Sequence, residues 1–193
     1  MDIRKQVLTN YGDWFTRFGD IWKTQLLQLG QRFVTEIELI RTPPVDATDV
    51  PIIFVKKNAL LSILLFLKEE PGFCYDFLSD ITATDEENEP RFEVVYNLFS
   101  TTKFNRIRIK TRVKDGEDVQ SAVDIWPAAN WAEREIFDMF GIKFLGHPDL
   151  RRILMDERFQ GHPLRKDYPL RGYQIFTEPE PVNAELLDSG ARK

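Results

Sequence analysis

The stretch RFEVVYNLFSTTKFNRIRIKTRV, residues 91–113, decides the fold because it holds two alternating segments around a polar turn. Successive side chains of a strand point to opposite faces, so this alternation predicts two neighbouring strands with one buried face each. The residues expected to face the core are Phe92, Val94, Tyr96 and Leu98 in the first strand, and Ile107, Ile109 and Val113 in the second. The residues expected to face outward are Arg106, Arg108, Lys110 and Arg112.

Patterns on both sides of this stretch predict the other elements, from apolar spacing of helical or strand period. Helices are expected at residues 10–29, 59–70 and 131–140, and strands at 33–39, 50–56 and 75–81. Strands that neighbour one another in hairpins, with helices beside them, indicate an α+β fold. We expect a mostly antiparallel sheet with helices packed to one side, followed by an extended C-terminal arm.

Three regions follow from this order of elements. Residues 1–45 form an N-terminal helix and strand region, 46–141 an α+β core domain, and 142–193 an extended arm and tail.

End signals define the helices more closely. Gly30 is expected to stop the first helix and Asn58 to cap the second. Asn130, with Glu133 three residues later, resembles a capping box, and Gly141 suits the left-handed position after the last turn. Arg134 and Asp138 are four residues apart on this third helix, where they can form an ion pair. Its apolar face holds Ile136, Phe137, Met139 and Phe140.

Beyond Gly141 the helical period fails and proline recurs. Pro148, Pro163 and Pro169 exclude a continuous helix. The sequence GHPDLR at 146–151 is echoed by GHPLR at 161–165, and basic residues outnumber acidic ones by seven to four over 141–171.

Composition excludes several classes of protein. The net charge of -5 argues against a general nucleic-acid binder, and a single cysteine, Cys74, forbids an internal disulfide. The longest apolar run, residues 59–67, is about nine residues long, against roughly twenty for a bilayer span. The first residues carry Asp2 and no apolar core of a secretory signal.

Three kinds of chemical site can be weighed from the residues. His147 and His162 suggest a metal, but a structural zinc wants four ligands and these are the only histidines, so hydrogen bonding is the default. Glu133, Glu135 and Asp138 suggest a general acid/base set, although Arg134 and the basic arm supply structural partners, and a free-standing enzyme would use Glu135, Asp138 and His147. The outward row of four cations suggests a nucleic-acid-binding sheet, but its apolar residues face the other way, which favours a solvated face or an acidic partner.

Other motifs of chemistry do not occur. The sequence has no glycine-rich dinucleotide or phosphate loop and no Gly-x-Ser-x-Gly elbow. Docking to a partner protein therefore remains as the main role of the arm, and an arm folded only on its own domain is the alternative. Guanidiniums suited to bidentate pairing with a partner are Arg151, Arg152 and Arg165. Apolar anchors are Leu150, Ile153, Leu154, Phe159 and Leu164.

These motifs closely resemble the thirty-kilodalton-type core subunit of respiratory complex I, NADH:ubiquinone oxidoreductase, known as the C subunit in bacteria and subunit 9 where mitochondria encode it. The resemblance is nearly gapless over about 45 residues and rests on WPAANW at 126–131, ERE at 133–135, DMFG at 138–141, GHPDLRRIL at 146–154 and GHPLRKDYP at 161–169. Ala132 departs from the family pattern, in which a bulkier residue often stands.

The resemblance implies a non-redox core subunit of the quinone module, needed for the assembly and stability of that module. It implies no cofactor in this polypeptide, with flavin and iron–sulfur clusters in partner subunits and ubiquinone as substrate of the complex. The implied partners are the forty-nine-kilodalton-type subunit and its quinone-module neighbours, with no nucleic acid and with membrane association only through the complex. The implied location is the matrix side of the mitochondrial inner membrane, or the cytoplasmic face of a bacterial one.

The resemblance also implies which residues dock partners, and none of them is expected to be catalytic. They are Trp131, Glu133, Arg134, Glu135, Asp138, Gly141, His147, Pro148, Asp149, Leu150, Arg151, Arg152, Leu154, Asp156, Phe159, Gly161, His162, Pro163, Leu164, Arg165, Lys166, Asp167 and Pro169.

Overall fold

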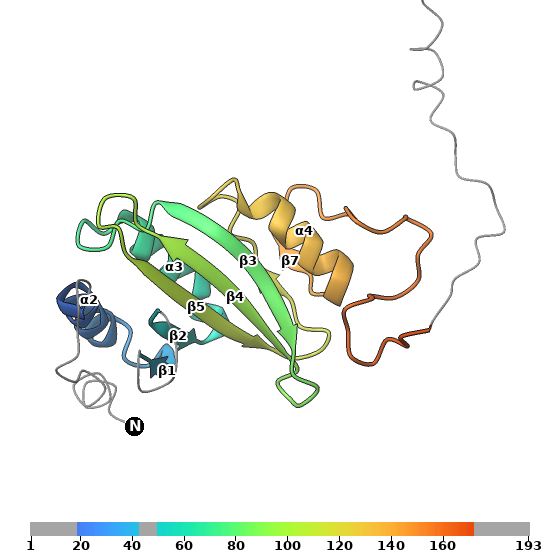
Figure 1. Cartoon of the computed structure of the whole chain (residues 1–193), viewed down its shortest axis with the longest axis horizontal. Coiled ribbons are helices and arrows are strands. Elements are labelled where there is room, and N and C mark those ends of the chain that lie inside the picture. The colour runs from blue at the N-terminus through green and yellow to red at the C-terminus, as the bar shows by residue number, and fades with distance from the viewer. Residues whose placement is uncertain (1–18, 43–49, 172–193) are drawn as a thin grey trace, which may run out of the picture.

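The centre of the molecule is a five-stranded sheet in the order β1-β2-β5-β4-β3 (Figure 1). The computed structural model describes residues 19–42 and 50–171. The strands are β1 (Ile37–Arg41), β2 (Ile52–Val55), β3 (Phe77–Asp85), β4 (Phe92–Phe99) and β5 (Arg106–Val113). Strands β2 and β5 are parallel and the other pairs are antiparallel, so the predicted α+β fold with a mostly antiparallel sheet is confirmed.

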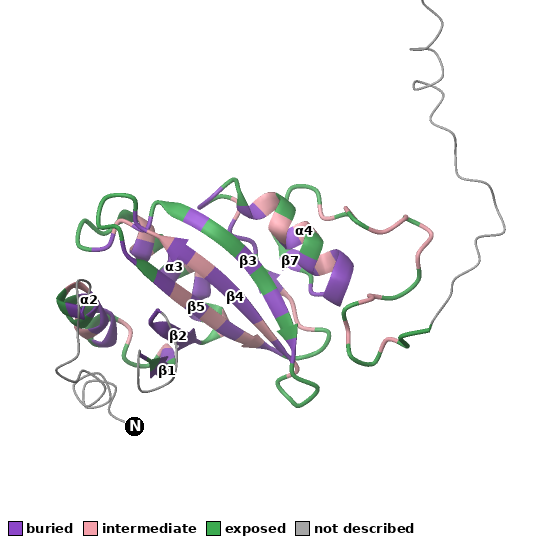
Figure 2. Ribbon diagram, viewed as in Figure 1, coloured by how far each residue is buried: buried purple, intermediate pink, exposed green. Residues whose placement is uncertain are grey.

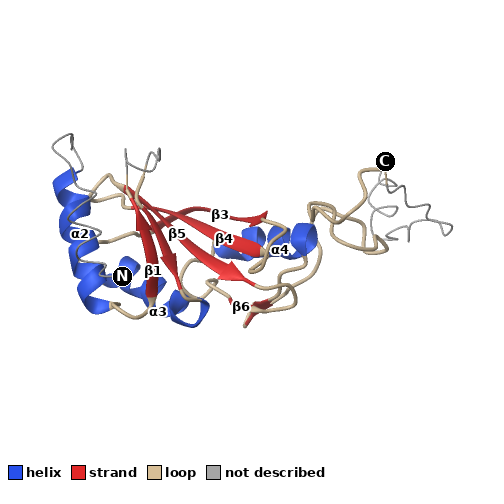
Figure 3. Ribbon diagram, turned by 90° about the horizontal axis from the view of Figure 1, so that it is seen from below, coloured by secondary structure: helices blue, strands red, loops and turns tan. Residues whose placement is uncertain are grey.

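Helices complete the fold on one side of this sheet (Figure 3). They are α2 (Gly19–Arg32), the short 3₁₀ helix η1 (Lys57–Ala59), α3 (Leu60–Glu69) and α4 (Ala129–Phe140). A second, two-stranded parallel sheet joins β6 (Val119–Gln120) to β7 (Phe144–Leu145), and so connects the segment before α4 to the segment after it.

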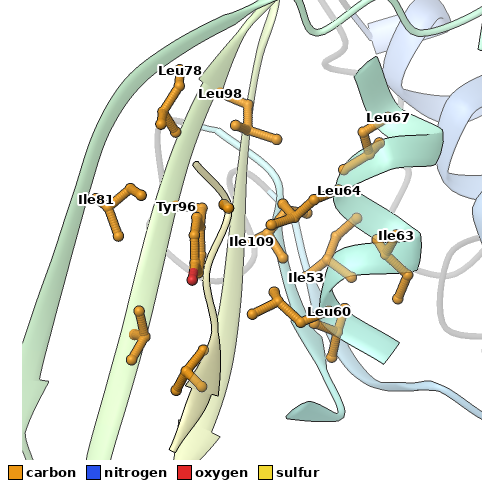
Figure 4. Packing of buried hydrophobic residues seen from close by; sticks show 14 of the residues in the cluster. Ile53, Leu60, Ile63, Leu64, Leu67, Leu78, Ile81, Tyr96, Leu98 and Ile109 are labelled. Atoms are coloured by element: carbon orange, nitrogen blue, oxygen red, sulfur yellow. The ribbon is translucent and has the colours of Figure 1, made fainter. Parts of the chain in front are cut away.

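The alternation in residues 91–113 sets the buried face. All seven residues expected to face the core are buried, and Figure 2 shows the alternation along β4 and β5. In the core Tyr96 and Ile109 lie opposite each other in register, and Ile53, Leu60 and Leu64 join the same cluster (Figure 4). Helices α2 and α4 also contribute residues to this cluster, so one continuous core holds α2, α3 and α4 against the sheet.

The N-terminal elements differ from expectation in their ends. Gly30 does not stop α2; it is buried inside the helix, which continues to Arg32. The expected helix residues 10–18 lie outside the described residues. Strand β1 begins at Ile37 rather than at residue 33, because the Ile37 N–H donates to the Phe33 carbonyl in a turn. A register shift after Ile37 then places Ile40, and not Leu39, in the core.

Two predicted side-chain caps are also wrong. Asn58 lies inside η1, and α3 begins after it with no side-chain cap. Asn130 lies inside α4, whose first residue is Ala129, and the preceding Ala128 has no capping side chain. By contrast, Gly141 adopts the expected left-handed conformation, with φ of 82°.

Strand β3 begins at Phe77, so Tyr75 is outside it although it is fully buried. The Tyr75 hydroxyl donates to Gln25 Oε1 at 2.9 Å and accepts from Asn105 Nδ2 at 3.0 Å. These bonds connect α2 to the start of β5.

Tyr75→Phe should therefore lower the free energy of unfolding by about 1–3 kcal/mol, since it removes two buried hydrogen bonds and leaves the Gln25 and Asn105 amides joined only to each other at this point. Tyr96→Phe is the matched control, because the buried Tyr96 hydroxyl has no hydrogen-bond partner among the described residues. Urea unfolding of both variants measures the difference. Equal losses would contradict the role given to the Tyr75 hydroxyl.

Candidate docking site

The Asp138 carboxylate fixes the middle of the arm on α4. It is fully buried and accepts hydrogen bonds from the backbone N–H groups of Ile153, Leu154 and Met155, at 3.1, 2.8 and 2.8 Å. Arg152 Nη1 donates to its other oxygen at 2.7 Å. Burial raises the pKa of Asp138, but these donors outweigh it and keep the pKa below its ordinary value.

The predicted ion pair between Arg134 and Asp138 is therefore wrong. Asp138 faces the arm, where three N–H groups and Arg152 surround it. Arg134 donates instead to the backbone carbonyls of Arg151 and Arg152, at 3.1 and 3.0 Å. Both residues hold the same turn of the arm: Arg134 binds its carbonyl acceptors, and Asp138 binds its N–H donors.

Both histidines make structural hydrogen bonds, as the sequence suggested. His147 Nδ1 accepts from the Asp149 N–H at 3.0 Å, which leaves Nε2 to donate to the Asn130 carbonyl at 3.0 Å. His162 Nδ1 donates to the Asp138 carbonyl at 2.9 Å. A Cβ at Gly141 would lie 2.7 Å from the His162 ring, so this position needs glycine for space as well as for its φ.

The part of the chain that the structure describes also contains no candidate metal site. Within residues 19–42 and 50–171 no group of three or more histidine, cysteine or acidic side chains is placed to hold a metal ion.

An arginine–aspartate cluster, made of Asp85, Arg91, Asp115, Arg165 and Asp167, returns the end of the described arm to the sheet. Arg91 pairs with Asp85 and with Asp167 at 2.9 Å each, and Arg165 donates to Asp115 at 2.9 Å. The Arg91 guanidinium lowers the pKa of Asp85 to about 2. Arg165 holds the pKa values of Asp115 and Asp167 below their ordinary range.

The three guanidiniums predicted to face a partner differ in exposure. The side chains of Arg152 and Arg165 are only 17% and 18% exposed and pair within the molecule. Arg151 is 67% exposed, and within the described ranges its ion pair is with Asp149, which is itself 53% exposed. Of the three, Arg151 alone is therefore presented outward, and the other two order the arm.

Apolar side chains are exposed around the ordered arm. Trp131 is 73% exposed, Leu154 61% and Leu164 55%. Leu145 and Leu170 are exposed as well. Among the predicted anchors, Leu150, Ile153 and Phe159 are half-buried, and the Phe159 ring packs on Tyr168. We call Trp131, Leu145, Leu154, Leu164 and Leu170 the exposed apolar set.

The remaining predicted docking residues lie around this set. Pro163 is half-buried, and the exposed ones are Pro148, Gly161, Lys166 and Pro169. Asp156 accepts from the Arg158 backbone and side chain, which lowers the pKa of Asp156 to about 2. Their docking role stays a prediction.

The structure does not bring the suggested acid/base residues together. Glu135 is exposed, whereas Glu133 and Asp138 are buried in separate environments. Glu133 accepts from Ser121 Oγ at 2.6 Å and from the Ala122 N–H at 2.7 Å, and so fixes α4 to the loop after β6. Burial raises the pKa of Glu133 to about 7. The spacing of Asn130 and Glu133 predicts that Glu133 takes part in a helix cap, and no local sequence pattern indicates its actual partners, Ser121 and Ala122.

The outward row of cations on β5 is largely compensated within the sheet. Lys110 and Arg112 pair with Glu93, and Arg108 donates to Asn97 Oδ1. Phe54 on this face is 2% exposed and lies beneath the cations of Lys110 and Arg112, and the Phe99 ring lies beneath the Arg106 guanidinium. Bases could not stack on Phe54, and the cations of this row are engaged within the sheet.

These features define a class of protein before any comparison: an α+β domain that orders its own C-terminal arm and leaves apolar side chains exposed around it. The model of the family described as respiratory-chain NADH dehydrogenase, 30 Kd subunit, matches residues 53–174. The polypeptide belongs to this family.

Relatives in bacteria agree with the family. The sequence is 47% identical over 150 residues to the C 2 subunit of the NADH-quinone oxidoreductase of Rhizobium etli (strain CIAT 652), over 77% of this sequence and 78% of that one. It is 49% identical over 120 residues to the C subunit of the same enzyme in Cereibacter sphaeroides (strain ATCC 17029 / ATH 2.4.9), over 62% and 60%.

Among solved structures, one polypeptide of the membrane-bound sulfane sulfur reductase, described as an archaeal respiratory membrane complex, is similar. Its TM-score is 0.64 with 25% identity, over 82% of this sequence and 96% of that one. Within the described ranges, none of the helices has the length and apolar character needed to cross a membrane.

Glu133 should make stability depend on pH. Its pKa is about 7 in the folded protein and 4.5 for the free group, so the folded state holds the proton more tightly between these values. Stability is then highest below about pH 4.5 with respect to this group and falls as pH rises through 7, by about 3 kcal/mol in all. Urea unfolding at pH 5 and pH 8 should show this loss, and Glu133→Gln should remove it. A variant with the same pH dependence as the parent protein would contradict the assignment.

Arg152→Ala should destabilise the isolated protein by about 2–3 kcal/mol, because it removes a charged hydrogen-bond donor from buried Asp138. Arg151→Ala, the neighbouring control, should stay within about 0.5 kcal/mol of the parent. Urea unfolding measures both, and limited proteolysis of residues 142–171 reports whether the arm loosens. A stable Arg152→Ala variant with a protected arm would overturn this account.

Proposed function

We propose that this protein is a non-redox core subunit of the quinone module in the peripheral arm of complex I, the proton-pumping NADH:ubiquinone oxidoreductase. In this role it supports the assembly and stability of the module that passes electrons from NADH to ubiquinone. Family membership and the names of the relatives support a subunit of this complex. The observation that carries the proposal is the combination of an ordered arm with exposed Leu154 and Trp131.

The ordered arm suits the protein to docking. A segment that is already held by Asp138 and by the arginine–aspartate cluster loses little conformational entropy when a partner binds. Each large apolar side chain of the exposed set can then contribute up to about 1.5–3 kcal/mol when a partner buries it. Trp131 is of the residue type that most often dominates an interface.

The proposed partners are the forty-nine-kilodalton-type subunit and neighbouring subunits of the quinone module. Flavin and iron–sulfur clusters are assigned to other subunits, and ubiquinone is the substrate of the complex. In support, His147 and His162 already serve the arm through hydrogen bonds, and Cys74 is the only cysteine in the sequence. Membrane association would come through the complex.

The proposed location is the matrix side of the mitochondrial inner membrane, with the cytoplasmic face of a bacterial membrane as the alternative. The relatives described above are bacterial, which supports the alternative. The same docking surface would serve either setting.

Leu154→Glu should deplete the assembled complex and leave the isolated protein folded. The side chain is 61% exposed, so the free protein should lose no more than about 0.5 kcal/mol, whereas a buried carboxylate in an interface costs far more. Native gels of membranes from cells that rely on this subunit, with quinone reductase activity, measure assembly.

Val34→Glu is the matched control, because Val34 is 53% exposed and lies outside α4 and the arm. It should assemble normally. A Leu154→Glu variant that assembles at the parent level, with full activity, would count against docking at this surface.

A further inference from the structure

The outer edge of β3 is open to another strand. Within residues 19–42 and 50–171, β4 is the only strand that pairs with β3, which is nine residues long and ends the sheet. An unpaired edge offers a row of backbone N–H and C=O groups, which proteins either protect or use for strand addition. Here the edge lies next to α4 and to two members of the exposed apolar set, Trp131 and Leu154.

A groove of about 520 Å³ runs between this edge and α4. Leu78 and Ile81 of β3 line one wall, and Ile153 and Leu154 of the arm line another. Ala132 lines it from α4, and its small side chain leaves room in the groove. The groove can thus take an apolar side chain from outside.

Trp131 also lines this groove, so its exposed ring stands where an inserted side chain would contact it. This places the largest member of the exposed apolar set beside the open strand edge.

The groove is acidic. Asp80 of β3 and Glu135 of α4 both line it and both are exposed. Neither carboxylate has an ion pair or side-chain hydrogen bond among the described residues, and no lysine or arginine lines the groove. Two exposed carboxylates beside an apolar groove fit a segment that carries apolar and basic side chains together.

We infer that this groove binds an extended, basic segment of a partner subunit, which adds to the sheet as a strand beside β3. The segment inserts an apolar side chain next to Trp131 and Ala132 and places a lysine or arginine against Asp80 and Glu135. The inference rests on the proposed function, because it names the chemistry of the segment that the partner supplies.

Photo-crosslinking in the assembled complex tests the strand. A crosslinking residue is placed at Thr82 or at Thr84, two exposed positions on the same face of β3, and at Gln31 of α2 as the control. Mass spectrometry identifies the crosslinked residues of the partner. For an added strand, moving the probe by two residues moves the crosslink by two residues along one basic segment.

A shift of three or four residues would indicate a helix, and an acidic segment would contradict the charge argument. Either result, or no crosslink in an assembled complex, would overturn the inference.

A charge exchange tests the carboxylates. Glu135→Lys should lower the amount of assembled complex by about tenfold, and Glu69→Lys, an exposed acid on α3, should not lower it. Changing the basic residue of the crosslinked segment to Glu should restore assembly with Glu135→Lys. Full assembly of the Glu135→Lys variant, or no restoration by the exchange, would overturn the inference.

These results separate the two proposals. If Leu154→Glu prevents assembly but Thr82 and Thr84 give no crosslink, docking stands and strand addition falls. If the parent protein is absent from the large complex, the proposed function falls with it.

Discussion

A buried carboxylate governs the shape of the C-terminal half of this protein. Asp138 is removed from water, and a buried charge is tolerated only where donors satisfy it. Three consecutive N–H groups and Arg152 provide those donors, so the backbone at 152–155 must turn around one side chain. This explains how a segment without helical or strand period is nevertheless ordered. The same constraint directs Leu154, which lies between two of these donors, outward into solvent.

Charge has different roles within the arm and in the groove beside it. Arg152 and Arg165 face carboxylates of their own molecule, where pairing limits the conformations of the arm. Apolar side chains face outward, as do the carboxylates of Asp80 and Glu135, which have no ion pair among the residues that the structure describes. Cations that look suited to a partner therefore serve to pre-organise the arm, and the exposed groove has the opposite charge. Of Arg151, Arg152 and Arg165, which we expected to pair with a partner, Arg151 alone faces outward.

The predictability of each element follows from the range of the interactions that form it. The period of β4 and β5 lies within the sequence, so their buried faces were predicted residue by residue. The pairing of Tyr75 with Gln25 and Asn105 joins segments 50 and 30 residues away, and no local pattern marks it. Asn130 and Glu133 have the spacing of a helix cap, but the Glu133 carboxylate instead accepts hydrogen bonds from Ser121 and Ala122, which precede the helix. Tertiary contacts decided these cases.

Helix α4 explains why its acids do not form a catalytic group. Each residue turns the helix by about 100°, so Glu133 points well away from Glu135 and Asp138, which are about 60° apart. One reaches the loop after β6, one lies in the groove with Trp131, and one holds the arm. The apolar residues Ile136, Met139 and Phe140 occupy the side toward the core. A single helix thus joins the sheet, the arm and the outer groove, and its density of charge reflects three separate contacts. The helix therefore resembles a catalytic site in composition but not in geometry.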